Sequence, residues 1–131
     1  MSLTYTSAEQ DGLLLASASG LICANDIQEF HESLSIDPSI KQGMGLLFDA
    51  TLADPTTNFA DLRAAAADFH KVADRGVRRV AIVAPEGLVS GLAHVYSIYA
   101  EAEGFEVEVF EGIEEARAWL MNLAQASELD S

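Results

Sequence analysis

The sequence predicts an α/β fold, with elements in the order ββαβαβαβα around a five-stranded mixed sheet. The first observation is the run VAIVA at Val80 to Ala84, which has no polar side chain, as expected of a strand covered on both faces. The second is Pro85, which suits the first turn of a helix that ends at Gly104. The third is the alternation in Glu106 to Phe110, which marks an edge strand with one solvated face. We expect about four helices and a single domain spanning 1–131.

The first part of the chain is typical of a hairpin followed by a helix. Leu3 to Thr6 and Leu13 to Ser19 are strand-like stretches, and the polar turn between them contains glycine, which favours an antiparallel hairpin. Asn25 is the predicted N-cap of the first helix, and Asp37-Pro38 is predicted to end it. The side chains expected to face inward from this helix are Ile27, Phe30 and Leu34.

The rest of the chain alternates between strand and helix. Gly45 to Asp49 predicts a short, central third strand, and 50–57 predicts a loop. Asn58 is expected to cap the second helix, for which Gly76 is a plausible residue just past the end. The apolar stripe expected on the third helix consists of Leu88, Leu92, Val95, Tyr96 and Tyr99. The last helix is expected from about Gly112 to Gln125, and its expected buried side chains are Ile113, Ala116, Leu120 and Leu123.

The composition excludes several classes of function. The net charge of −14 disfavours binding to nucleic acid or to an anionic membrane surface, because a phosphate footprint needs clustered Lys and Arg. Such a charge favours basic partners, although a merely solvated surface accounts for it as well. A single Cys23 excludes an internal disulfide and indicates a reducing compartment. With no signal-like start and no run of ~18 apolar residues, we expect a cytoplasmic protein without a membrane span.

Three segments carry a resemblance to a known family. They are LLFDA at Leu46 to Ala50, RRVAIVAP at Arg78 to Pro85 and EVFEGIEEARAWL at Glu108 to Leu120. With the element order, they resemble the SpoIIAA-like family of STAS-type domains over nearly the whole chain. The resemblance implies a small α/β fold with a mixed sheet, related in shape to STAS regulators and to Sec14-type lipid carriers.

One position departs from the pattern of the STAS antagonists of anti-sigma factors. In those proteins the third strand ends in Asp followed directly by a phosphorylated Ser. Here Ala50 follows Asp49, and Thr51 comes one residue later with Leu52 behind it. Because the acceptor is missing, we do not expect partner switching by phosphorylation.

The carboxyl ends of the third and fourth strands are the predicted ligand site. In parallel strands these ends open on one edge of the sheet, where ligands of α/β folds collect. Carboxylates and hydroxyls without Lys or Arg suit a neutral or cationic molecule. For Asp49 the alternative is that it caps the loop behind it, and for His94 that it is an ordinary exposed helix residue. The predicted ligand-binding residues are Asp49, Thr51, Glu86, Ser90 and His94, with Phe69 and Tyr96 as candidate apolar walls.

Three functions compete. We expect a non-catalytic regulatory or protein-binding module without a cofactor, because no nucleophile–base pair, metal set or cofactor motif is visible. His31, His70 and His94 fall on three different predicted helices, without the spacing of a metal site. The alternative is a binder of a small apolar or neutral ligand in a Sec14-like crevice. An enzyme comes third, supported only by a crevice with Asp49 and Thr51. The sequence also admits a homodimer.

Overall fold

The five-stranded mixed sheet predicted from the sequence is confirmed. A computed structural model describes residues 2–8, 12–21, 24–54, 74, 76–77, 79–84, 87–102 and 104–130. The strands are β1 (Ser2–Ala8), β2 (Leu13–Leu21), β3 (Gly45–Asp54), β4 (Arg79–Val83) and β5 (Glu106–Phe110), and the helices are α1 (Ala24–Ile36), α4 (Leu88–Ala102) and α5 (Ile113–Asp130). The helix predicted to begin at Asn58 lies outside the described residues.

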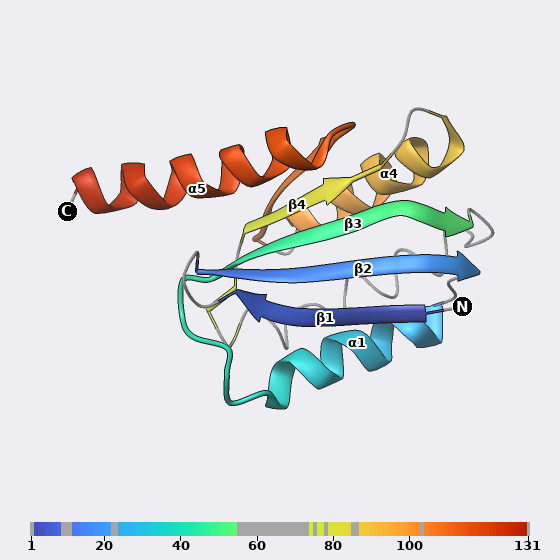
Figure 1. The fold of residues 1–131 in the computed structure, drawn as a ribbon, viewed down its shortest axis with the longest axis horizontal. Helices are drawn as coiled ribbons and strands as arrows, with labels where there is room; N and C mark the ends of the chain where they lie inside the picture. The colour runs from blue at the N-terminus through green and yellow to red at the C-terminus, as the bar shows by residue number, and fades with distance from the viewer. Residues whose placement is uncertain are drawn as a thin grey trace.

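The strands lie in the sheet in the same order as in the chain, β1-β2-β3-β4-β5. β1 is antiparallel to β2, as the predicted hairpin requires, and every other pair is parallel. Connections between parallel strands are almost always right-handed. Connections that all lead to the next strand on the same side therefore place their helices on one face of the sheet. Accordingly, α1 and α4 both lie behind the strands in Figure 1. The chain reaches the opposite face with α5, after the last strand.

The two faces of the sheet have cores of very different size. The larger core, under α1 and α4, is centred on Leu14, Leu34, Leu46 and Ile82, with the Phe30 ring 5.8 Å from that of Phe48. The smaller core, under α5, consists of Leu13, Leu47, Ala81, Val83, Ala116 and Leu120. Its close packing depends on Gly45, where a Cβ atom would lie only 3.0 Å from Cδ2 of Leu120.

Among the described helices α5 alone packs on its face of the sheet, and it leaves part of that face open. A helix with its side chains is ~10–12 Å wide, and neighbouring strands are ~4.8 Å apart, so one helix covers about two strands. α5 packs on β4, with β3 and β5 to either side. On the strands farther away, the side chains of Thr4, Thr6 and Ser17 are exposed. A hollow lies at this open part of the sheet.

Several boundaries and burials differ from those predicted. β3 continues to Asp54, so the stretch expected to be a loop begins as strand and Asp49 is not a strand end. Ile113 was expected in the core but is 49% exposed, because it lines the open hollow. The expected ends of α1 and α4, before Asp37 and before Gly104, are confirmed. His31, which the inward-facing pattern did not include, is 1% exposed.

A hydrogen-bonded cluster ties β1 to the end of α1. The hydroxyl of Tyr5 donates to Oδ2 of Asp37 at 2.6 Å, while Oδ1 of Asp37 accepts bonds from the backbone N–H and the hydroxyl of Ser39 at 2.8 and 2.7 Å. The Tyr5 ring also meets Phe30 edge-on at 5.8 Å. Burial, followed by the hydrogen bond and the charge of Asp37, raises the pKa of Tyr5 to about 12.

The packing predicts a large difference between two isoleucines. Ile82 is 5% exposed in the larger core, whereas Ile98 on α4 is 64% exposed. We expect Ile82→Ala to lower the free energy of unfolding by about 2–5 kcal/mol through loss of burial and formation of a cavity. The matched control Ile98→Ala should stay within about 0.5 kcal/mol of the wild type. Urea unfolding measures both, and a loss below about 1 kcal/mol for Ile82→Ala would contradict its place in the core.

The raised pKa of Tyr5 predicts a loss of stability in alkali. Because the folded pKa of about 12 lies above the ordinary value of 10.0, the stabilising contribution is complete below pH 10. It is lost as the pH rises from 10.0 towards about 12. In Tyr5→Phe this contribution is absent, so the free energy of unfolding should fall less steeply in that window. Denaturant unfolding at several pH values tests this, and equal slopes in the two proteins would refute it.

Candidate functional site

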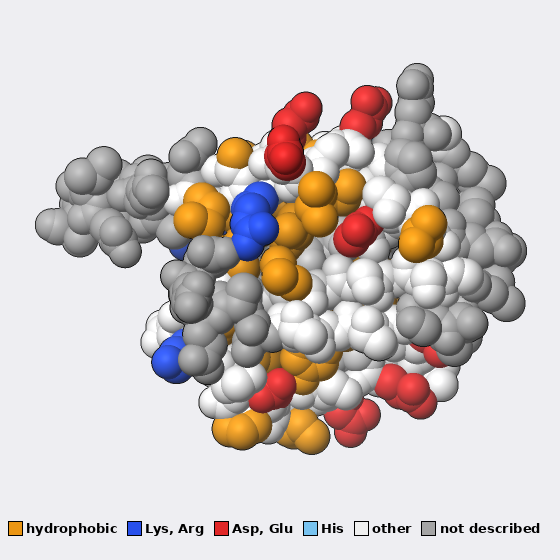
Figure 2. All heavy atoms as spheres, in the orientation of Figure 1, with side chains coloured by type: hydrophobic (Ala, Val, Ile, Leu, Met, Phe, Trp, Pro, Cys, Tyr) orange, Lys and Arg blue, Asp and Glu red, His pale blue; other side chains and the backbone are white. Residues whose placement is uncertain are grey.

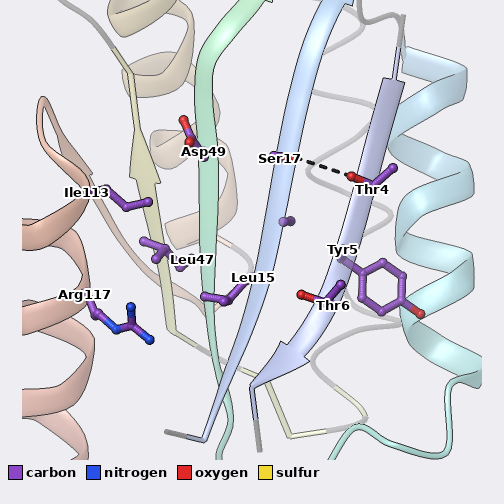
Figure 3. A pocket seen from close by; sticks show the side chains of 10 residues that line it. Thr4, Tyr5, Thr6, Leu15, Ser17, Leu47, Asp49, Ile113 and Arg117 are labelled. Atoms are coloured by element: carbon purple, nitrogen blue, oxygen red, sulfur yellow. Dashed lines mark hydrogen bonds between the residues drawn. The ribbon is translucent and has the colours of Figure 1, made fainter.

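A hollow of about 290 Å³ lies between β1, β2, β3 and the first half of α5. Figure 3 shows its floor on the strands and its wall on α5, from which Ile113 and Arg117 point towards the sheet. Because Thr4, Thr6 and Ser17 are exposed, the hollow opens to solvent along β1 and β2. The lining residues are Thr4, Tyr5, Thr6, Leu15, Ala16, Ser17, Leu47, Asp49, Ile113 and Arg117.

The lining combines apolar side chains with hydroxyls and one charge of each sign. Leu15 and Leu47 form an apolar strip beside the smaller core. The hydroxyls of Thr4 and Ser17 lie 3.4 Å apart and share a hydrogen bond across the two strands. Figure 2 shows hydrophobic side chains gathered in the middle of this face, with a basic side chain beside them and acidic ones around. Such a surface can bind through apolar contact and hydroxyl hydrogen bonds at the same time.

A bulge in β3 shapes one end of the hollow. Ser17 is paired with Asp49 and Ser19 with Leu52, so β3 has one residue more than β2 between these pairs. Oδ1 of Asp49 accepts hydrogen bonds from the N–H and the hydroxyl of Thr51, at 3.0 and 2.7 Å. This is the local capping interaction that was the alternative interpretation of Asp49. The pairing with Ser19 brings Leu52 to the same face as Asp49, where it is 74% exposed.

The structure brings together two of the five predicted site residues. Asp49 and Thr51 are joined at the bulge. His94 is exposed on α4, which covers the opposite face of the sheet from the one that Asp49 faces. Glu86 and the candidate wall residue Phe69 lie outside the described residues, as do the side chains of Ser90 and Tyr96.

Sequence reasoning missed the contribution of α5 and β1. Arg117 supplies a guanidinium at a site where no Lys or Arg was expected. Its helix comes after the last strand, so only the folded sheet brings it near Asp49. A signal for β1 was present in the sequence, because Thr4 and Thr6 alternate with Leu3 and Tyr5. Such alternation indicates that one face of the strand is left to solvent.

The described part of the chain shows neither a metal site nor a membrane-spanning helix. Within it, no three His, Cys, Asp or Glu side chains are arranged to hold a metal ion. None of its helices is long and apolar enough to cross a membrane.

The bulge predicts that Asp49 acts as a hydrogen-bond acceptor. We expect Asp49→Ala to lower the free energy of unfolding by about 0.5–1.5 kcal/mol, since Thr51 loses both bonds. Asp49→Asn keeps a carbonyl oxygen at the same place and should lose less than half as much. Urea unfolding gives both values. Equal losses in the two variants would show that the charge, rather than the acceptor, matters at this position.

Comparison with known proteins agrees with this fold. The family model described as SpoIIAA-like matches residues 13–121. Among solved structures, the chain is similar to an uncharacterized protein from the DUF3478 family with a SpoIIAA-like fold, from Shewanella loihica PV-4. The two share 20% sequence identity with a TM-score of 0.57, over 91% of this chain and 92% of that one, a likeness that concerns the fold. No curated protein matches the chain.

Proposed function

The chain belongs to the SpoIIAA-like family, and on this premise we propose that it is a non-catalytic module that binds a partner protein on the open part of its sheet. The observation that carries the proposal is a pair of exposed hydrophobic side chains on this face, one lining the hollow and the other at the bulge that shapes one end of it. Leu52 on β3 is 74% exposed and Ile113 on α5 is 49% exposed. Large apolar side chains that flank a concave surface are typical of protein interaction sites.

The shape of the hollow supports a protein as the ligand. Sites for small molecules usually bury most of the ligand's surface. Here Thr4, Thr6 and Ser17 are exposed along one whole side, so a small molecule would stay largely in contact with water. A helix or an extended segment of another protein would instead lie along the hollow over Leu15 and contact the exposed Ile113 and Leu52 on the same face.

The charge of the chain supports a basic partner. Asp and Glu number 21 against 7 Lys and Arg, which gives the net charge of −14. A field of one sign steers oppositely charged partners towards the surface and speeds their association at low salt. We therefore expect a partner with a basic binding surface, whose association slows as salt is added.

The ionisable groups of the hollow support a role without catalysis. A general base must be free to take a proton from a substrate held within hydrogen-bond reach. Asp49 instead accepts two hydrogen bonds from Thr51, and the guanidinium of Arg117 does not act as a base. Tyr5 turns its ring away from the hollow, towards α1 in Figure 3, and donates to Asp37.

One observation favours a second candidate, the binding of a small apolar or neutral ligand. The volume of about 290 Å³ is close to the lower end of the range of small-molecule sites, which begins near ~300 Å³. The apolar strip on its floor would suit such a ligand.

Capture from an extract of the source cells, with variants of the exposed hydrophobic side chains, tests the proposed function. We expect a protein retained by the wild type to be lost or reduced at least tenfold with Leu52→Asp and with Ile113→Asp. The control is Ile98→Asp, an equally drastic change at a 64% exposed side chain on the opposite layer, which should retain the partner.

Two results would contradict the proposal. One is retention of the same proteins by the wild type and all three variants, since the open face would then play no part in binding. The other is a stoichiometric small molecule in the native mass spectrum of the purified protein, lost with Leu52→Asp, which would favour the second candidate.

A further inference from the structure

The two edge strands of the sheet are protected to very different degrees. At one edge, β5 carries exposed Glu106 and Glu108, charges that discourage pairing with another strand. At the other edge, the seven residues of β1, SLTYTSA, include no charge and no proline. The pairing of β1 with β2 also runs without a bulge, from Ser2 opposite Ser19 to Ala8 opposite Leu13. Charge, proline and a bulge, three of the devices that blunt an edge strand, are therefore absent from β1.

The outer side of β1 offers backbone groups for further pairing. Among the described strands β1 pairs with β2 alone, at the end of the sheet. Alternate N–H and C=O groups of an edge strand point outwards, and they need partners if they become buried. We infer that this edge receives an extended, basic segment of the partner protein, which adds to the sheet as a sixth strand. The inference rests on the proposed function in one respect, that the ligand is a protein.

The neighbouring helix indicates the chemistry of this segment. Tyr5 of β1 contacts Phe30 of α1 and Asp37, the residue after its end, so the helical row 26, 30, 33 faces β1. The adjacent row 29, 33, 36 carries exposed Glu29 and, at 76% exposure, Ile36. α1 contains three acidic residues, at 26, 29 and 32, and no Lys or Arg. Alternate side chains of an added strand would point towards α1, where Lys or Arg would meet these carboxylates.

The other side chains of the added strand would lie on the opposite face, next to Thr4 and Thr6. These two residues line the hollow and are exposed. β-branched side chains such as Val pack well against Thr across neighbouring strands. The segment that fits the edge therefore alternates between basic and β-branched residues.

A second copy of the chain fits this edge less well than a single segment. Two antiparallel copies of β1 would be related by a twofold axis through the joined sheet, which places both α1 helices on one side. α1 contacts β1 on the larger-core face of the sheet, behind the strands in Figure 1. The two acidic helices would then face each other closely, and each copy also brings a net charge of −14.

Peptides of defined chemistry test the inference. The probe is an acetylated and amidated peptide of sequence KVKVKVK, titrated into the isotope-labelled protein while backbone amide shifts are recorded. Two further versions carry N-methyl groups on alternate residues, one set along each edge of the peptide. We expect shifts centred on the amides of β1. One methylated version should bind at least tenfold more weakly, and the other should bind like the parent, because only one edge of the peptide pairs with the protein.

Charge variants provide a matched comparison. Glu29→Gln should weaken binding of the parent peptide about two- to fivefold, the range of a single exposed ion pair. Glu108→Gln removes the same charge at the opposite edge of the sheet and should leave the affinity unchanged. The acidic peptide EVEVEVE should not bind.

Three results would overturn the inference. Equal binding of both methylated peptides, with shifts around the hollow, would reject pairing at the edge and leave the proposed function intact. Failure of every basic peptide to bind would reject a basic strand as the ligand, while the capture experiment with the Leu52 and Ile113 variants would still decide the proposed function. A dimer in sedimentation, with the β1 amides protected from exchange, would show that a second copy occupies the edge.

Discussion

The arrangement of the whole molecule depends on one topological constraint, parallel strand pairing in the order of the chain. Each right-handed connection between neighbouring parallel strands returns on the same face, so α1 and α4 share the larger core. Of the described helices, only α5, the helix after β5, lies on the opposite face. One helix covers too few strands, and the hydroxyl-bearing side of β1 and β2 is left open. The candidate site is thus a consequence of topology, before any individual side chain is considered.

Local features turn this open area into a defined surface. Gly45 allows α5 to approach the sheet, which brings Ile113 and Arg117 to the border of the hollow. The bulge, held by Asp49 and Thr51, brings Leu52 to the same face. Apolar and hydroxyl groups on the strands therefore share one face of the sheet with two exposed hydrophobic side chains. A surface of this kind suits recognition of another protein, and the uncharged edge of β1 lies directly beside it.

The sequence allowed the sheet to be predicted well and the site only in part. The buried strand at Val80 to Ala84 and the alternating one at Glu106 to Phe110 are local patterns, and each corresponds to an observed strand, although β4 ends at Val83. The burial of Ile113 was predicted wrongly, because helical periodicity gives the direction of a side chain but does not tell whether the space that it points into is filled. The end of β3 was placed at Asp49, since a bulge that extends a strand depends on pairing with its neighbour. Arg117 could not be predicted for the same reason, as its place depends on long-range packing.

Site-specific photo-crosslinking in the source cells tests most directly whether the open face is the binding surface. A photoreactive phenylalanine analogue would replace Leu52 in one chain and, as the control, Ile98 in another, both being exposed hydrophobic positions on opposite layers. We expect a discrete crosslinked protein of one mass from position 52 and none from position 98. Crosslinking to that protein from position 98 alone would contradict the account, because the partner would then bind the outer surface of α4, on the opposite layer.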